Sequence, residues 1–504
     1  MSSKSKTSRA KSTAVLSTMV LLGICAAFTP KTWARYSGGT GEPNDPYRIS
    51  TAEDLNDIGN YEEDWSKYFI LINDVNLAQY TGTQFKIIGR WIDWGDPNNK
   101  PFTGVFDGND KRIWNFTWDS NGIDGVGLFG YVGSGGQIKN FGMENVNVNT
   151  GGKFVGGLVG YSERAIITHC YSVGSVGGNA TVGGLVGYNY VGEITSCYLT
   201  GSITGENGVG GLVGSNFFGT IADCYSRGNV SGHDNVGGMV GFNDGIISDC
   251  QCTSSVLGRG YVGGVVGSNE WGSILACSFE GTVSSGGSYC GGVAGINRSH
   301  ARIFGCYSTG IVSGPAHTGG LTGGNFSGLI SEGVVESCYS ANKVEGNWVA
   351  GGLVGLNKAE VSNSYSEGSV SGSDTVGGLI GSNGTSTLGY GRISRCYSNG
   401  PVLGTTNVGG LVGLNDSGFV EDSFWDIETS DQLASAGGTG KTTAEMQTKS
   451  TFTDAAWDFV EIWGIGEKQT YPFLRFAPAG DFNYDKKVDL FDLAILASHW
   501  LEEK

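Results

Sequence analysis

The chain has 504 residues and a formal net charge of −17, with 88 glycines but only 9 prolines. This excess of acidic groups argues against nucleic acid or an anionic membrane as a partner. Glycine is more than twice as frequent as its usual share of roughly 7%, which favours tight turns between short strands. The low proline content excludes a Pro/Gly linker protein.

The first 34 residues have the layout of a signal peptide. A basic start is followed by an apolar stretch over residues 14 to 28, and Thr32-Trp-Ala34 offers a small-residue cleavage site. The alternative is an uncleaved anchor helix, but the apolar stretch is shorter than the ~20 residues of a membrane span. We therefore expect a secreted or cell-surface protein with no integral membrane span in the mature chain.

Residues 35–121 predict an N-terminal cap region. Ser50-Thr51-Ala-Glu53-Asp54 is a capping box that opens a short helix through about Ile58. Strand-like runs follow at 68–72, 85–88 and 102–106. Because the open end of a repeat stack exposes sheet edges, a cap is expected there.

An internal repeat dominates residues 122–420. A Val-Gly-Gly-Leu-Val-Gly-like hexapeptide recurs eleven times, mostly at spacings of 26 to 28 residues and at most 32. A near-constant period of this length indicates a repeat architecture. The leucine or its equivalent falls at Leu128, Leu158, Leu185, Leu212, Met239, Val265, Val293, Leu321, Leu353, Leu379 and Leu411.

Two further residues recur at nearly fixed distances after the hexapeptide. An asparagine follows its last glycine by two residues at Asn189, Asn216, Asn243, Asn269, Asn297, Asn325, Asn357, Asn383 and Asn415. An Ile-x-x-Cys-like stretch then ends at Cys170, Cys197, Cys224, Cys250, Cys277, Cys306, Cys338 and Cys396, with Ser364 and Ser423 in the same position of two copies.

Each repeat is interpreted as three short strands separated by glycine turns. No unit buries its apolar face alone, so units must stack, ~4.8 Å apart, with like residues on like. Stacked asparagine amides can then hydrogen-bond along the axis, and the small cysteine or serine side chains fit an interior ladder. The prediction is an all-β protein: a parallel β-solenoid, similar to a β-helix, of about eleven repeats of 26–32 residues with end caps. A propeller or a closed prism of sheets is the alternative, although propeller repeats are longer, at ~40 residues.

The repeated cysteines allow two interpretations. Disulfides between neighbouring coils need Cα atoms ~5.5 Å apart, which stacking nearly supplies. Serine replaces cysteine in two copies, however, and this favours small buried residues with free thiols. Cys252 and Cys290 stand outside the repeated position and are candidates for an exception.

The hexapeptide copies, such as Val182 to Gly187 and Val209 to Gly214, resemble the GLUG motif, which is known from bacterial surface proteins and adhesins. The resemblance covers about residues 122 to 420. It implies a surface or adhesin-like protein and no shared chemistry.

Residues 421–478, with three tryptophans, predict a C-terminal cap region, and residues 479–504 predict a calcium loop followed by a helix. Oxygen-bearing side chains occupy loop positions 1, 3, 5, 9 and 12, and position 7 supplies a backbone carbonyl. The alternative is an acidic turn before a helix. The predicted Ca²⁺ ligands are Asp481, Asn483, Asp485, Lys487, Asp489 and Asp492.

This C-terminal segment is similar to one repeat of a dockerin, which implies calcium and a cohesin-like protein as partner. It departs from that pattern at Lys486, where such loops usually carry glycine, and only one copy is present.

No cluster of carboxylates with arginine or lysine is evident in the repeats, so no catalytic or cofactor-binding residue is predicted. Aromatic residues instead fall near the turns after the hexapeptide, where a strip of rings would stack on sugars or pack between coils. We expect a non-catalytic solenoid for adhesion, display or binding of a polysaccharide or cell-surface ligand. The alternatives are a dockerin-bearing β-helix polysaccharide lyase or glycoside hydrolase and a structural envelope component. The aromatic residues are Tyr188, Tyr190, Phe217, Phe218, Phe242, Trp271 and Trp348.

Overall fold

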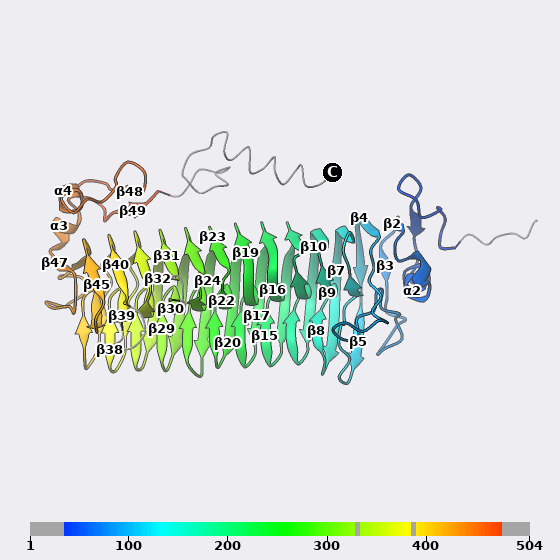
Figure 1. The fold of residues 1–504 in the computed structure, drawn as a ribbon, viewed down its shortest axis with the longest axis horizontal. Helices are drawn as coiled ribbons and strands as arrows, with labels where there is room; N and C mark the ends of the chain where they lie inside the picture. Colours follow the sequence, from blue (N-terminus) through cyan, green and yellow to red (C-terminus); the bar gives the residue numbers. More distant parts are fainter. Residues whose placement is uncertain (1–34, 328–332, 385–389, 476–504) are drawn as a thin grey trace, which may run out of the picture.

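A computed structural model describes residues 35–475 except 328–332 and 385–389. The chain winds into a rod of stacked coils whose strands lie across the long axis (Figure 1). Strands of successive coils pair in parallel, which confirms the predicted parallel β-solenoid. The predicted signal peptide, 1–34, and the predicted calcium loop with its helix, 479–504, lie outside the described residues.

Each complete coil has four strand segments, so the prediction of three was wrong. In the coil that starts at Ala180, they are β11 (Ala180–Gly183), β12 (Val186–Tyr190), β13 (Glu193–Thr195) and β14 (Tyr198–Thr204). The additional turn lies at Val191, whose φ of 57° is left-handed and separates the second segment from the third. First segments form one ten-stranded sheet, and the other segments join one continuous sheet.

The segments have these bounds in chain order. The N-terminal elements are β1 (Tyr47–Ile49), α2 (Ala52–Asn60), the 3₁₀ turn η1 (Glu62–Asp64), β2 (Tyr68–Leu71), β3 (Val75–Asn76), β4 (Val105–Trp114), β5 (Thr117–Ser120), β6 (Phe129–Val132) and β7 (Gln137–Thr150). The first segments are β8 (Lys153–Gly156), β11, β15 (Asn207–Gly210), β18 (Asp234–Gly237), β21 (Tyr261–Gly263), β25 (Tyr289–Gly291), β29 (His317–Gly319), β33 (Val349–Gly351), β38 (Thr375–Gly377) and β43 (Val408–Gly409). The second segments are β9 (Val159–Glu163), β12, β16 (Val213–Ala222), β19 (Val240–Ser248), β22 (Val266–Glu270), β26 (Ala294–Arg298), β30 (Thr322–Phe326), β34 (Val354–Lys358), β39 (Ile380–Asn383) and β44 (Val412–Asn415), of which β16 and β19 continue through the third segment.

The remaining segments complete the coils. The third segments are β13, β23 (Ser273–Leu275), β27 (Arg302–Phe304), β31 (Val334–Glu336), β35 (Glu360–Ser362), β40 (Arg392–Ser394) and β45 (Phe419–Glu421), and β10 (Ile166–Gly177) spans a third and a fourth segment. The fourth segments are β14, β17 (Tyr225–Ser231), β20 (Gln251–Gly258), β24 (Ser278–Ser285), β28 (Tyr307–Gly314), β32 (Tyr339–Gly346), β36 with β37 (Tyr365–Ser366, Val370–Ser371), β41 with β42 (Tyr397–Ser398, Val402–Leu403) and β46 (Phe424–Asp426). The C-terminal elements are β47 (Thr439–Lys441), α3 (Thr443–Met446), α4 (Lys449–Thr453), β48 (Trp463–Gly464) and β49 (Phe473–Leu474).

The hexapeptide forms the corner between the first and second segments. Its leucine is fully buried in every copy. A Cβ on Gly183 would lie 2.0 Å from the carbonyl oxygen of Val186, and one on Gly187 would lie 2.6 Å from the backbone of Phe154. These short distances leave no room for a side chain at either position. Glycine therefore lets the two segments pack closely at the corner, where their outer faces meet at a shared edge.

The repeated asparagines form a continuous ladder inside the rod, as predicted. From Asn189 to Asn415 each Nδ2 donates to Oδ1 of the asparagine in the next coil, at 2.8 to 3.0 Å. Most of these amides also donate to a backbone carbonyl of their own coil, such as Asn189 to Gly192 at 3.0 Å. The ladder therefore satisfies buried polar groups and fixes the register of the coils.

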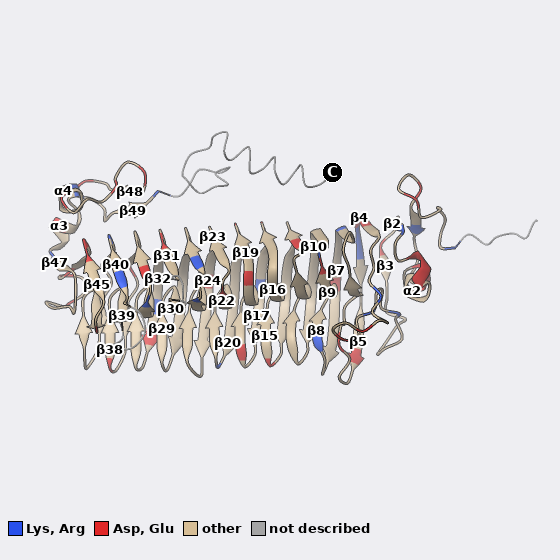
Figure 2. Ribbon diagram, viewed as in Figure 1, with Lys and Arg blue, Asp and Glu red and all other residues tan. Residues whose placement is uncertain are grey.

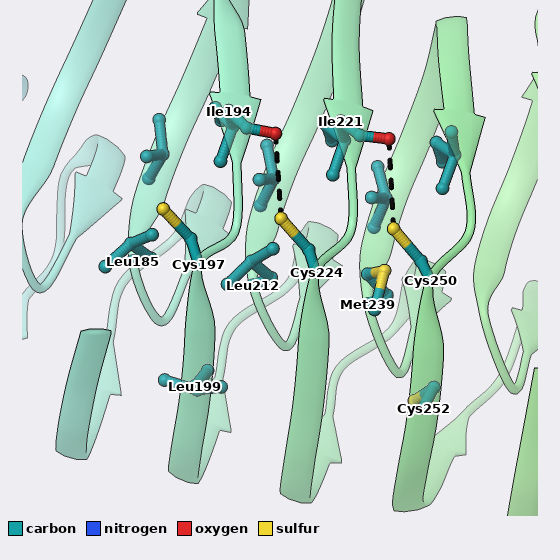
Figure 3. Packing of buried hydrophobic residues seen from close by; sticks show 14 of the residues in the cluster. Leu185, Ile194, Cys197, Leu199, Leu212, Ile221, Cys224, Met239, Cys250 and Cys252 are labelled. Atoms are coloured by element: carbon teal, nitrogen blue, oxygen red, sulfur yellow. Dashed lines mark hydrogen bonds between the residues drawn. The ribbon is translucent and has the colours of Figure 1, made fainter. Parts of the chain in front are cut away.

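The repeated cysteines form a second buried ladder (Figure 3). Cys224 Sγ donates to the carbonyl oxygens of Ala222 and, in the preceding coil, Ile194. Ser423 continues this ladder by accepting from the backbone N–H of Cys396 at 3.1 Å. All ten described cysteines are free and buried, including the two outside the repeated position.

The N-terminal region joins the stack directly. Strands β1, β2, β4 and β7 pair in parallel, so coiling begins within residues 35–121. The Thr51 side chain accepts from the backbone N–H of Asp54, and helix α2 runs to Asn60. The prediction of a strand at 85–88 was wrong: this irregular segment makes one bridge, from Ile88 to Phe129, and the side chains of Phe85 and Ile88 are buried in the core.

The C-terminal region packs beside the last coils as well as over the end of the rod (Figure 1). Trp457 and Trp463 lie in one buried cluster with Tyr365 and Tyr397 of the solenoid. The Tyr397 hydroxyl donates to the carbonyl oxygen of Pro472 at 2.6 Å. Aromatic burial therefore holds the cap region to the repeats.

Candidate functional site

The outward positions of the second segments form a column of functional side chains along the rod. Parallel register places equivalent residues of successive coils next to one another. The column is Glu163, Tyr190, Phe217, Asp244, Glu270, Arg298, Phe326 and Lys358. Rings therefore lie on both sides of a charged stretch, on a rod whose strands otherwise carry few charges (Figure 2).

Rings of successive coils stack in the first part of this face. The ring centroids of Tyr161 and Tyr188 are 5.3 Å apart, and those of Tyr188 and Phe217 are also 5.3 Å apart. Phe242 continues the series at 4.9 Å from Phe217. We call Tyr161, Tyr188, Phe217 and Phe242 the ring stack.

Three charged residues follow the ring stack, and we call Asp244, Glu270 and Arg298 the polar centre. Glu270 accepts hydrogen bonds from Arg298 and from the Ser268 hydroxyl. Asp244 lies at the equivalent position one coil earlier, because Asn243 and Asn269 are in register. Burial, and to a lesser extent the nearby charge of Glu270, raises the pKa of Asp244 to about 6.

A second aromatic group lies beyond the polar centre. Tyr289 stacks on His317 at 4.6 Å and meets Phe326 edge-on at 5.7 Å. Arg298 lies 5.7 Å from the ring centroid of Tyr261, and this contact joins the polar centre to the second group. Tyr261, Tyr289 and Phe326 are the second ring group, and together with the ring stack and the polar centre they form the aromatic face.

The structure brings together only some of the predicted aromatic residues. Tyr188, Phe217 and Phe242 lie in the ring stack, and Tyr190 lies beside it in the column. Phe218 is largely exposed next to Phe217. Trp271 stacks on His300 instead, and Trp348 is exposed in the turn before β33.

Sequence reasoning missed the second ring group and the polar centre. Tyr261 and Tyr289 belong to first segments, at or before the start of the hexapeptide, whereas the predicted aromatic residues lie near the turns after it. Asp244 lies in β19 with its carboxylate beside Glu270. Alignment of the repeats at the asparagine would have placed Asp244, Glu270 and Arg298 in one column.

The described part of the chain contains no group of three or more His, Cys, Asp or Glu side chains placed to hold a metal ion. The predicted calcium ligands lie beyond it. Among the described residues, no helix is both long and apolar enough for a membrane crossing.

Comparison with known sequences identifies the repeats. The family described as "The GLUG motif" matches residues 178–204, 205–231, 258–284 and 346–371. The rod therefore contains GLUG repeats, as the hexapeptide predicted. These repeats, together with the relatives below, support a GLUG repeat protein.

Two curated relatives match parts of the chain. Halomucin of Haloquadratum walsbyi is 31% identical over 147 residues, which are 28% of this chain and 2% of halomucin. A protein named "Putative Gly-rich membrane protein" of Evansella cellulosilytica is 52% identical over 56 residues, 11% of this chain and 6% of that protein. The chain thus spans a small fraction of the length of these relatives, whose names are consistent with a surface role.

Among solved structures, a chain titled "putative immunoglobulin A1 protease from Bacteroides ovatus" matches 87% of this chain and 95% of its own length. The sequence identity is 17% and the TM-score is 0.29.

Proposed function

We propose that this protein is an exported, surface-associated solenoid that binds carbohydrate polymers through its aromatic face. The observation that carries the proposal is the order of side chains along the rod: stacked rings, a polar centre, then rings again. Sugar rings present apolar C–H faces and polar hydroxyl edges, so aromatic faces and neighbouring carboxylate and guanidinium groups match them.

The spacing of the face suits a linear polymer. Each coil contributes one side chain to the column, ~4.8 Å from the next along the axis, so a chain lying parallel to the axis would meet a series of contacts along its length. The rings of Phe217, Phe242, Tyr289 and Phe326 are half-buried, which fixes their orientation and leaves part of each exposed. Rigid rings bind at a low cost in conformational entropy.

The charges of the protein favour a neutral polymer. Arg298 pairs with Glu270, and Asp244 adds a second carboxyl group, so the polar centre carries no net positive charge. The net charge of the chain is −17, which opposes a polyanionic ligand at low ionic strength.

We further propose that residues 479–504 bind Ca²⁺ through Asp481, Asn483, Asp485, Asp489, Asp492 and the carbonyl of Lys487. The spacing of these oxygens along the chain supports this. A cohesin-like protein is the partner that the dockerin resemblance implies. Calorimetric titration of the full mature chain with CaCl₂ tests the site: one binding event is expected, and Asp481→Ala with Asp492→Ala should abolish it.

One observation favours a second function, glycoside hydrolysis. Asp244 and Glu270 are neighbouring carboxylates in different environments, since Asp244 has a raised pKa whereas Glu270 pairs with Arg298. Paired carboxylates of this kind serve as acid and nucleophile in glycosidases.

One experiment separates these functions. The mature protein is incubated with a panel of plant and algal polysaccharides, with calcium and with chelator, and both retention and new chain ends are measured. Retention without new ends is the expected result. New ends that disappear in Asp244→Asn would replace the binding function by hydrolysis. Absence of both retention and new ends on every polymer would contradict both functions.

A further inference from the structure

One loop covers the start of the aromatic face. Residues 91–99, which we call the strap, leave the body after Arg90 and return at Lys100. The backbones of these two residues exchange two hydrogen bonds, at 2.7 and 2.8 Å. The strap is therefore a closed loop with its two ends side by side.

The strap lies on the ring stack through two tryptophans. Trp94 meets Tyr161 and Tyr188 edge-on, with ring centroids 5.6 and 5.9 Å apart. Trp91 meets Phe154 of β8 at 4.7 Å. Tyr161 and Tyr188 are consequently only 3% and 9% exposed, whereas Trp94 itself is 59% exposed.

Aromatic contact is what attaches the strap to the ring stack. Every hydrogen bond of residues 91–99 in the described structure stays within residues 90–100, such as Ile92 N–H to Asn99 Oδ1 at 2.7 Å and Asn99 Nδ2 to the carbonyl of Asp93 at 2.6 Å. At the base of the loop, Arg90 and Lys100 pair with Glu62. The strap can thus leave the rings with its internal hydrogen bonds intact.

Phe154 adds a second, independent observation. Its φ of 55° is left-handed, a conformation that is unfavourable for a bulky side chain. The equivalent residues of the following coils, Thr181, Gly208 and Asn235, share this left-handed conformation, which glycine and asparagine adopt readily. The strained phenylalanine places one more ring beneath the strap, next to Tyr161 and Tyr188.

We propose that Phe154, Tyr161 and Tyr188 form a further sugar-stacking subsite, which the strap covers in the free protein and leaves when a long neutral polysaccharide binds. This inference rests on the proposed function, because Tyr161 and Tyr188 are the N-terminal members of the ring stack and Phe154 adjoins them. Trp94 occupies the space beside Tyr161 and Tyr188, and a polymer that extends past Phe217 would compete with it for these rings.

Two variants test the subsite. In the first, residues 91–99 are replaced by Asn-Gly, because paired ends such as Arg90 and Lys100 can be joined by a two-residue turn. In the second, Trp94→Ala removes the covering ring and keeps the loop. Ile92→Ala is the matched control, since Ile92 is an exposed apolar residue of the same loop without a ring.

Binding is measured with hydroxyethyl cellulose as the long probe and cellotriose as the short one. Both strap variants should bind the polymer roughly fivefold more tightly than the native protein, with unchanged binding of cellotriose and no effect of Ile92→Ala.

Unchanged or weaker polymer binding in both variants, beside a native protein that binds, would overturn the subsite alone and show that the strap is a fixed part of the face. If neither the native protein nor the variants bind either probe, the proposed function fails together with the subsite.

Discussion

The side-chain amide of Asn243 donates to Asn269 Oδ1 at 2.8 Å, across the boundary between two coils. Asn269 in turn donates to Asn297 at 2.8 Å, so each amide is both donor and acceptor along the axis. All three residues are fully buried. The register that this ladder fixes is the same register that aligns the aromatic face on the outside of the rod.

Asn269→Leu should destabilise the coils around it. The substitution leaves the Oδ1 atom of Asn297 without its donor and removes one bond of Asn243, and an unsatisfied buried group costs about 1–3 kcal/mol. A repeat array need not unfold in one step, so hydrogen exchange of individual coils is the suitable measurement. Asn415→Leu, at the last rung, should cost less, and equal protection in both variants would contradict the role of the ladder.

Ser162→Asn should add a rung and stabilise the N-terminal coils by about 1 kcal/mol. Ser162 is in register with Asn189, and Ser162 Oγ and Asn189 Oδ1 are both buried without a hydrogen-bond partner in the described structure. An asparagine at position 162 would donate to Asn189 as every later rung does. Ser162→Ala is the control and should change stability little; thermal unfolding that is no higher for Ser162→Asn would contradict the geometry.

The interior thiols should be unreactive until the protein unfolds. Burial raises the pKa of Cys277 and Cys306 well above the usual value of a thiol, and a buried thiol is inert. Titration with a thiol reagent should therefore label native protein slowly and denatured protein fully. Rapid labelling of native protein, or fewer thiols after denaturation without reductant, would show exposed thiols or disulfides instead.

Cys224→Ser should cost under about 1 kcal/mol, because serine already occupies this position at Ser364 and Ser423 and accepts from the same backbone N–H. Cys224→Leu should cost about 1–3 kcal/mol, since the coils leave no space for the larger side chain. Chemical unfolding curves of the two variants provide the measurement. A similar loss of stability in both variants would contradict a position limited by side-chain size and would show that it requires sulfur.

Asp244 should make stability depend on pH in a defined direction. Its pKa of about 6 in the folded protein lies above the ~3.9 of an unfolded chain. The folded state therefore binds more protons between these values, and stability falls as the pH rises from about 4 to about 6.

Asp244→Asn should reduce this fall and raise stability at pH 7 by less than about 1 kcal/mol, since the side chain is only partly buried and solvent screens it. Thermal unfolding at pH 4, 5, 6 and 7 provides the measurement, with Asp374→Asn, in an exposed turn, as the control. Parallel pH profiles for Asp244→Asn and the native protein would refute the assignment.

The period of the sequence was sufficient to predict the parallel solenoid and both interior ladders. Residues such as Asn216 and Cys224 recur at one position per coil. Stacking places each of these interior residues against the equivalent residue of the next coil. The turn at Val191 was missed because a β-branched residue rarely adopts a left-handed conformation, and its strain is visible only in the folded chain.

The outer face was harder to predict, since no residue type recurs there. Phe217 and Asp244 occupy equivalent positions on neighbouring coils although they have nothing in common chemically. Trp94 reaches the face from a loop that precedes the repeats by more than 25 residues, and no sequence pattern in the strap indicates Tyr161 as its partner. The boundaries proposed for the cap regions and the calcium loop stay predictions.

The most direct test of the account is the dissociation constant of a retained polysaccharide for the native protein and for a Phe217→Ala/Phe326→Ala double variant. Tyr198→Ala is the control, since Tyr198 is an exposed, stacked tyrosine of the fourth segment β14. If the aromatic face binds the polymer, the double variant should bind about tenfold or more weakly, while the control binds as the native protein does. Equal affinity in all three proteins would contradict the aromatic face as the binding site.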